Sequence, residues 1–370
     1  MKYPALLPFA DILPQLNDFD AIIDARSPSE FAEDHIPGAI NCPVLDDAQR
    51  VRVGTMYKQV NTFEAKKLGA MLIARNIADH IEALFIDKPK DWKPLIYCWR
   101  GGNRSGAMSH ILAKIGWPVI QLDGGYKEYR RHVSATLAEH AARLSYTVVC
   151  GPTGSGKSRL LQVLAAQGAQ VLDLEQLAAH RGSVLGNLPT TPQPSQKAFE
   201  SSIWNLLRHF DPALPVFVES ESKKVGNLRV PDALMEKIRG SRCIALGLAQ
   251  ADRVKLLMDD YLHFVADPAL LNTQLSCLTA LHGRETIDRW QKMAVDGDMQ
   301  ELVEELLVRH YDPAYLQSIK RNFDQFGEAH VLELPDISDE AFLSAAQTLH
   351  RATRLLGPLR YFASKKIKHQ

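Results

Sequence analysis

Two loops in this 370-residue chain have residue types and spacings suited to chemistry on anions. The first starts at Cys98 and ends with Arg104 and Ser105, and the second, 151–158, reads Gly-Pro-Thr-Gly-Ser-Gly-Lys-Ser. A cysteine thiolate is a soft nucleophile. A glycine loop that ends in Gly-Lys-Ser turns its backbone N–H groups toward phosphates. Because few reactions need both, the pair indicates an enzyme that moves a chalcogen atom and also handles a diphosphate.

The first loop stands between an apolar run of strand length, 94–97, and a segment with helical periodicity, 105–116. A helix N-terminus and the N–H groups of such a loop attract negative charge, which favours the nucleophilic form of Cys98. Arg104 is suited to close over a bound oxyanion, and Ser105 to cap the helix or to hydrogen-bond the thiolate. The alternative is an unreactive buried cysteine, which the surrounding pattern disfavours. The intervening residues are Trp99, Arg100, Gly101, Gly102 and Asn103.

The second loop follows a strand-like run and precedes a helical segment, as a phosphate-binding loop requires. Its residues are Gly151, Pro152, Thr153, Gly154, Ser155, Gly156, Lys157 and Ser158. We expect Lys157 to neutralise a terminal phosphate and the Ser158 hydroxyl to bind Mg²⁺. Asp173 and Glu219 lie toward the ends of two predicted strands and are candidates for a carboxylate beside the metal, with ordinary solvated acids as the alternative. The loop predicts diphosphate binding and does not by itself predict ATP hydrolysis.

Composition and charge narrow the class of protein. The 43 basic and 43 acidic residues cancel, so any surface for a nucleic acid must be local. The five cysteines are scattered without a C-x-x-C pair, which disfavours a structural zinc site or a disulfide framework and suits a reducing compartment. The chain has no run of about eighteen apolar residues and no signal-like apolar segment near Met1. We therefore expect no membrane span and a cytoplasmic location.

Alternating strand-like and helical runs predict an α/β fold with two parallel-sheet domains and a mostly helical C-terminal part. Residues 1–131 are expected to form the first domain, and 132–145 a linker helix. Residues 146–250 are expected to form a P-loop NTPase-like domain, which the helical region 251–370 could complete. The predicted strands are 21–24, 94–97, 118–122, 146–150, 171–175, 215–219 and 243–246.

The first domain resembles the rhodanese family of sulfurtransferases. The matching residues are Asp24, Ala25, Arg26, Glu30, Phe31, His35, Ile36, Pro37, Gly38, Ala39, Asn41, Asp123, Gly124, Gly125 and Tyr126. The loop departs from that family, because five residues rather than four separate Cys98 from Arg104. The wider spacing suits a larger anion and is shared with C-x5-R phosphatases, which usually have His where this chain has Tyr97.

Nearly the whole chain is similar to the bacterial tRNA 2-selenouridine synthase family. The Cys-Trp-Arg-Gly-Gly loop followed by a P-loop carries the likeness, together with 173–175, 179–183, 193–197, 218–222 and 310–315. Ser220 is a small departure, since the family often has an acidic residue there. The resemblance implies that 2-thiouridine at the tRNA wobble position becomes 2-selenouridine. It implies selenophosphate and geranyl diphosphate as co-substrates, Mg²⁺, and no tightly bound cofactor.

The resemblance also implies roles for the two loops. We assign selenation to the first domain, with Cys98 and Arg104 catalytic and 99–105 holding selenophosphate, and geranyl transfer to the second. Cys98 could carry selenium as a perselenide, activate the donor or accept the geranyl group, and the sequence leaves these open. It also leaves open which tRNAs are modified, whether the reactions share a pocket, and the oligomeric state.

The implied partners are the anticodon region of a tRNA and an enzyme that supplies selenophosphate. The acid-free segment 341–370 could contact RNA phosphates, although charged runs are usually solvated faces. Tyr311 and Tyr315 could stack on a base or pack between helices. The segment 182–196, rich in Gly, Pro, Thr and Ser, predicts a long mobile loop. Other basic candidates for RNA contact are Arg100, Lys223, Lys224, Arg229 and Arg253.

Three other functions fit parts of the pattern. A C-x5-R phosphatase fused to a nucleotide-binding domain fits the loop spacing, but Tyr97 argues against it. A thiosulfate sulfurtransferase with an ATPase domain fits the first domain, but the spacing disfavours it. A non-catalytic scaffold is disfavoured because Cys98, Arg104, Lys157 and Ser158 are all present.

Overall fold

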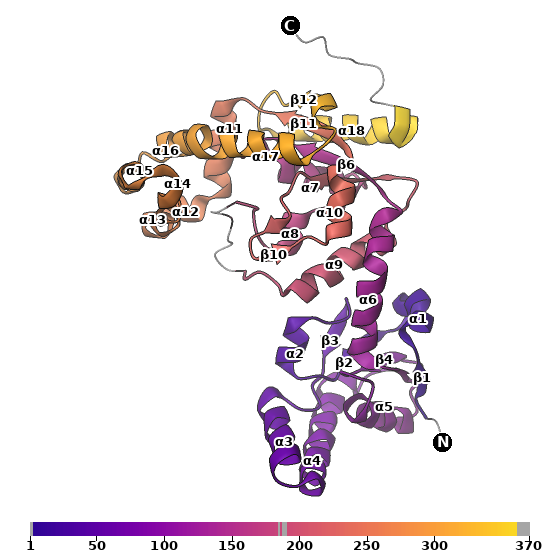
Figure 1. Cartoon of the computed structure of the whole chain (residues 1–370). Coiled ribbons are helices and arrows are strands. Elements are labelled where there is room, and N and C mark those ends of the chain that lie inside the picture. Colours follow the sequence, from indigo (N-terminus) through magenta and orange to yellow (C-terminus); the bar gives the residue numbers. More distant parts are fainter. Residues whose placement is uncertain (1–2, 184–185, 187–190, 361–370) are drawn as a thin grey trace. The chain divides into compact units, whose positions relative to one another are not determined.

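The computed structural model describes residues 3–183, 186 and 191–360, and these form two compact units. The first consists of Met1–Leu137 with Ser195–Asn205, and the second of Ala138–Pro194 with Leu206–Gln370. Each unit is built on its own five-stranded parallel sheet (Figure 1). The predicted fold class, two parallel-sheet α/β parts with a mostly helical C-terminal region, is confirmed.

The sheet of the first unit has the order β1-β5-β4-β2-β3, and all its paired strands are parallel. Its strands are β1 (Ala5–Leu7), β2 (Ala21–Asp24), β3 (Ala39–Asn41), β4 (Pro94–Tyr97) and β5 (Ile120–Leu122). Its helices are α1 (Phe9–Ile12), η1 (Leu13–Asp18), α2 (Pro28–Glu33), α3 (Asp47–Gln59), α4 (Thr62–His80), η2 (Ile81–Phe85) and α5 (Asn103–Ile115). The helix α6 (Gly125–Ala142) begins in this unit.

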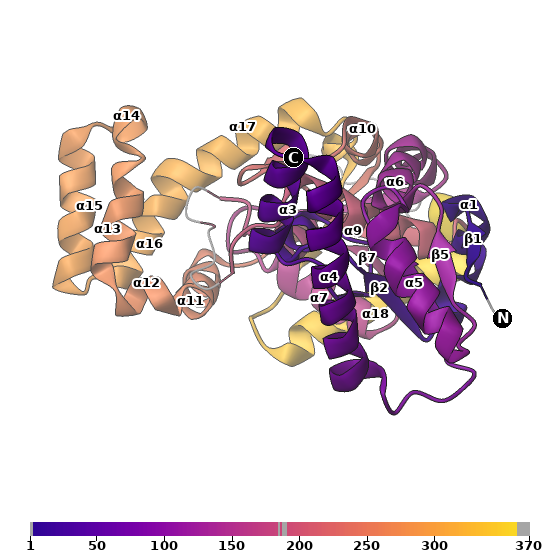
Figure 2. The ribbon, with the colours of Figure 1, turned by 90° about the horizontal axis from the view of Figure 1, so that it is seen from below.

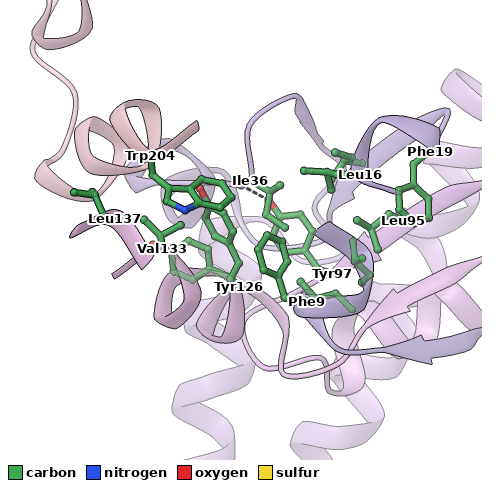
Figure 3. Close-up of a cluster of buried hydrophobic side chains, with 14 residues drawn as sticks. Phe9, Leu16, Phe19, Ile36, Leu95, Tyr97, Tyr126, Val133, Leu137 and Trp204 are labelled. Carbon is green, nitrogen blue, oxygen red and sulfur yellow. Dashed lines mark hydrogen bonds between the residues drawn. The ribbon is translucent and has the colours of Figure 1, made fainter. Parts of the chain in front are cut away.

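Side chains alternate between the two faces of this sheet, so each face has its own core. Leu95 and Tyr97 of β4 belong to one cluster, whereas Ile96 belongs to the other. Figure 3 shows the first cluster, in which Trp204 packs with Val133 and Leu137 of α6. The Trp204 indole N–H also donates a hydrogen bond to the Thr136 hydroxyl at 3.0 Å. The segment 195–205 therefore contributes to the core of the first unit.

The sheet of the second unit has the order β12-β11-β6-β8-β7 and is also parallel throughout. Its strands are β6 (Ser145–Cys150), β7 (Gln170–Leu172), β8 (Pro215–Glu219), β11 (Arg242–Gly247) and β12 (His330–Glu333), beside a hairpin of β9 (Lys224–Val225) and β10 (Leu228–Arg229). The helices near the sheet are α7 (Lys157–Ala166), α8 (Leu174–Ala178), α9 (Gln196–His209), α10 (Asp232–Arg239), α17 (Asp312–Asn322), η4 (Phe326–Glu328) and α18 (Asp339–Arg360). Within α9, only the residues after Asn205 belong to this unit.

A group of helices extends the second unit beyond its sheet. It comprises α11 (Gln250–Asp260), α12 (Leu262–Ala266), α13 (Pro268–Ser276), α14 (Thr279–His282), α15 (Arg284–Asp296), α16 (Met299–Leu306) and η3 (Leu307–Tyr311). These helices have a core of their own around Trp290 and Leu302, which are fully buried. Figure 2 shows α13, α14 and α15 at the outer end of the group.

Several predicted boundaries differ from the structure. The predicted strand 171–175 ends at Leu172, because the Asp173 carboxylate accepts a hydrogen bond from Gln176 N at 2.8 Å and starts α8. The predicted linker helix 132–145 is the later part of α6. The predicted loop 182–196 ends at Gln196, where α9 begins, and residues 184–185 and 187–190 lie outside the described part. Within that part, no helix has the length and apolar character to cross a membrane.

Candidate functional sites

The cysteine loop connects the buried strand β4 to the helix α5, as predicted. Cys98 is only 3% exposed, and the Ser105 hydroxyl lies 3.1 Å from its sulfur as a donor. The side-chain amide of Gln121, on β5, donates to Gly101 O at 2.7 Å and reaches the Ser105 oxygen at 3.4 Å. Ser105 is therefore positioned to hydrogen-bond a thiolate. The exposed members of the loop are Arg100, Gly102 and Asn103, and Trp99 and Gly101 are half-buried.

The turn between β5 and α6 packs against this loop through backbone contacts. Tyr126 N donates to Cys98 O at 2.7 Å. A Cβ added at Gly125 would lie 2.3 Å from Cys98 O and 2.5 Å from Gly101 N, and Gly125 has a φ of +59°. Only glycine satisfies both the close approach and this backbone conformation. The Asp-Gly-Gly-Tyr run thus fixes the shape of the cysteine loop.

Arg104 forms a bidentate ion pair with Glu30, which lies in the first turn of the helix α2. Its two terminal nitrogens lie 2.5 and 3.2 Å from the two carboxylate oxygens. Burial alone would raise the pKa of Glu30, but hydrogen bonds and the charge of Arg104 outweigh it and hold that pKa below its ordinary value. Glu30 also accepts from Ser27 N at 3.2 Å, which completes a capping box. The sequence marked Glu30 as a family residue, but not as the partner of Arg104.

Aromatic stacking orients Trp99 at the loop. Its ring stacks on Tyr126 with centroids 5.3 Å apart, and the Arg26 guanidinium lies 4.0 Å from the Tyr126 ring centroid. Arg26 is itself buried and paired with Asp24 at 2.6 Å. The Tyr126 hydroxyl donates to Asp34 at 2.8 Å. These contacts leave Trp99 a fixed neighbour of the cysteine.

The glycine loop connects β6 to α7, again as predicted. Lys157 Nζ donates to Gly151 O at 2.8 Å, so it folds back over the loop. The Ser155 hydroxyl is buried and has no hydrogen-bond partner among the described residues. Gly154 and Gly156 have φ of +77° and +83°, which only glycine adopts without strain. Fixed donors and an unpaired hydroxyl in one loop suit a phosphate group.

The carboxylate that contacts Ser158 is not one of the two candidates named from the sequence. Neither candidate bonds Ser158, because Asp173 caps α8 and the fully buried Glu219 accepts from Glu175 N at 2.9 Å. The Ser158 hydroxyl instead donates to Glu175 at 3.1 Å. Burial and the neighbouring Glu175 raise the pKa of Glu221 to about 8. Sequence reasoning missed Glu175, whose position depends on the turn into α8.

The described residues contain no group of three or more His, Cys, Asp or Glu placed to hold a metal ion. Ser158 with the nearby Glu175 oxygen offers only part of a Mg²⁺ coordination shell. These residues therefore fit a Mg²⁺ ion that takes its other ligands from a bound diphosphate and from water, as Mg²⁺ commonly does.

An apolar pocket lies beside the glycine loop. It encloses about 560 Å³ of empty space, part of it open to solvent, and Thr153 of the loop lines it together with α11, α12, α13, α16 and η3. The polar atoms along its wall belong to Ser183, Tyr261 and Tyr311, and the other lining side chains, apart from Thr153, are hydrocarbon or thioether groups. The sequence predicted the helices of this region but not the pocket.

Three of the residues considered for RNA contact lie at the apolar pocket or the glycine loop. Tyr311 lines the apolar pocket, and the Tyr315 hydroxyl accepts from Gly151 N at 2.6 Å. Arg253 is buried, bonds Thr153 O at 2.7 Å and pairs with Asp312. The prediction that Arg253 faces RNA is therefore wrong, because Arg253 is buried and hydrogen-bonds the backbone of the glycine loop. In the tail, 361–370 lies outside the described residues.

A cysteine anion loop on one parallel sheet and a P-loop on another define the class: a two-part enzyme with a rhodanese-like and a P-loop unit. The family models agree with this division. A rhodanese-like domain matches residues 10–132, and the tRNA 2-selenouridine synthase AAA domain matches residues 144–274.

Relatives that match most of this chain identify the particular family. The tRNA 2-selenouridine synthase of Nitrosomonas europaea is 32% identical, over 81% of this chain and 89% of its own length. That of Bdellovibrio bacteriovorus is 30% identical over the same shares. That of a Sulfurovum species is 35% identical over 67% of this chain and 70% of its own. The chain belongs to the tRNA 2-selenouridine synthase family and is a tRNA-modifying transferase.

Proposed function

We propose that this protein converts 2-thiouridine at the tRNA wobble position to 2-selenouridine in two steps. The second unit first transfers a geranyl group from geranyl diphosphate to the tRNA sulfur. The first unit then replaces the geranylated sulfur with selenium from selenophosphate. The observation that supports this two-step reaction most strongly is the apolar pocket beside the glycine loop, because it places a hydrocarbon site next to a phosphate site.

The two parts of this site match the two parts of geranyl diphosphate. The loop amides, Lys157 and the unpaired Ser155 hydroxyl suit the diphosphate. The pocket wall of leucines, methionines and aromatic rings suits the geranyl chain, since burial of hydrocarbon is favourable by about 0.8 kcal/mol for each CH₂. A nucleotide base and ribose would leave many polar atoms unpaired in such a pocket. The site therefore favours a prenyl diphosphate over ATP.

The first step forms a bond between the tRNA sulfur and carbon 1 of the geranyl group, while the bond from that carbon to the diphosphate oxygen breaks. The electron pair leaves with the diphosphate, and the loop amides and Lys157 stabilise the added charge. Bound Mg²⁺, next to Ser158, would supply further charge neutralisation. S-alkylation makes the sulfur a better leaving group. A bond then forms between selenium and carbon 2 of the base while the bond from that carbon to sulfur breaks, and the electron pair leaves with the sulfur as geranylthiol. Water cleaves the selenium–phosphorus bond, which releases phosphate and leaves 2-selenouridine.

The cysteine loop suits the second step. Its residues Arg100, Gly102 and Asn103 are exposed, and Glu30 holds the Arg104 guanidinium. We assign selenophosphate to this loop and the thiolate role to Cys98. The tRNA anticodon region and an enzyme that supplies selenophosphate are the partners of this proposal, with the cytoplasm as its location.

Mass spectrometry of tRNA nucleosides tests this proposal. The protein is incubated with 2-thiouridine tRNA, geranyl diphosphate, Mg²⁺ and selenophosphate, beside Cys98→Ala and Lys157→Ala. We expect 2-selenouridine from the wild type, the S-geranyl base from Cys98→Ala and unchanged 2-thiouridine from Lys157→Ala. The absence of both products with a folded wild-type protein would refute the proposed function.

A further inference from the structure

The pocket beside the glycine loop begins directly at that loop. Leu257, on α11, packs so tightly on Gly154 that a Cβ added there would lie 2.9 Å from the Leu257 Cδ1 atom. Arg253, one turn earlier on α11, bonds Thr153 O. Because Thr153 and Leu257 both line the pocket, one end of it lies against the residues that would grip a diphosphate.

Another part of the pocket wall comes from α13, which follows α11 and α12 in the chain. Leu271, on this helix, lines the pocket and is 3% exposed. Behind it lies the core of the helical group, with Leu275 and Trp290 fully buried. The helix α13 packs against α12 and α15, and Figure 2 shows it at the outer end of the group, with α11 nearer the sheet. Leu271 therefore belongs both to the pocket wall and to that packed core.

We propose that Leu271 limits the length of the prenyl chain that this enzyme accepts. The inference rests on the proposed geranyl transfer and deepens it. A diphosphate fixed at the glycine loop directs the chain along α11 toward α13. A chain one isoprene unit longer than geranyl would have to displace Leu271 against the packed side chains of that core, and overpacking of a core is destabilising. The structure thus assigns the choice between geranyl and farnesyl donors to α13.

Leu271→Ala tests this assignment, with Leu275→Ala as the matched control. Both residues are buried leucines on α13, one helical turn apart and in the same core, but only Leu271 lines the pocket. The assay measures kcat/KM for geranyl and farnesyl diphosphate with 2-thiouridine tRNA. We expect the farnesyl-to-geranyl ratio to rise at least tenfold in Leu271→Ala and to change less than twofold in Leu275→Ala.

A larger side chain at position 271 tests the same point, because it reduces the space in the pocket without leaving a cavity in the core. Leu271→Phe should lower kcat/KM for geranyl diphosphate at least tenfold while transfer from dimethylallyl diphosphate is retained. Equal ratios in Leu271→Ala and Leu275→Ala, or equal losses with both donors in Leu271→Phe, would overturn the inference. A wild type that transfers no prenyl group would instead refute the proposed function, so the two failures are distinct.

Discussion

The ion pair between Glu30 and Arg104 makes the sharpest prediction about the cysteine loop. Glu30→Gln keeps the shape of the side chain and its acceptor for Ser27 N, but removes the charge that holds Arg104. Hydrogen bonds to charged groups contribute about 1.5–3 kcal/mol, and the two side chains are only 15% and 19% exposed, so screening by water is limited. Since 1.4 kcal/mol corresponds to a factor of about ten, kcat/KM for selenophosphate should fall roughly ten- to a hundredfold.

The assay follows 2-selenouridine formation on S-geranylated tRNA at varied selenophosphate concentration. Geranyl transfer by the same variant serves as an internal reference, because Glu30 is in the first unit and the glycine loop is in the second. Glu33→Gln is the matched control, since Glu33 is also on α2 and pairs with Lys197 at the surface. If Glu30→Gln selenates as well as Glu33→Gln does, Glu30 does not position Arg104.

Four further predictions concern the first unit. Gly125→Ala, with its Cβ against Cys98 O, should lower the free energy of unfolding by about 2–5 kcal/mol in chemical denaturation. Ser105→Ala removes the donor to the cysteine sulfur and should slow selenation about three- to tenfold, with geranyl transfer unchanged. Trp204→Ala should lower the free energy of unfolding by about 3–5 kcal/mol, measured by the shift of the denaturation midpoint. The pKa of Glu30 is depressed, so its contribution to stability is present above pH 4.5 and is lost as pH falls through its lower folded value. The difference in unfolding free energy between wild type and Glu30→Gln should therefore shrink below that pH, and a constant difference would contradict this.

The sequence predicts both loops because each is a local pattern. A buried strand, a run of glycines and a helix follow one another within a few residues, and the structure has β4 with α5 and β6 with α7 at these places. The strand 171–175 was predicted too long because its apolar residues continue past Asp173, and only the capping bond to Gln176 N shows that the chain turns there.

The partners of the loop residues could not be predicted from the sequence, because these contacts depend on tertiary packing. Glu30 is 74 residues before Arg104, and Glu175 meets Ser158 only through the turn into α8. The apolar pocket is a further example. Helical periodicity identifies which faces of α11, α13 and α16 are apolar, but not where those faces fail to fill the space between them.

The position of Trp204 has a consequence for how the chain folds during its synthesis. The rhodanese-like match ends at residue 132, but the core of the first unit is completed by a segment that follows the glycine loop and two strands of the other sheet. During synthesis from the N-terminus, the cluster that contains Trp204 is therefore completed only after Ser195–Asn205 has left the ribosome, whereas the cluster on the other face of the sheet lies wholly within residues 1–137. The enzyme is built of two units, but its first unit cannot be obtained whole by cutting the chain at a single point.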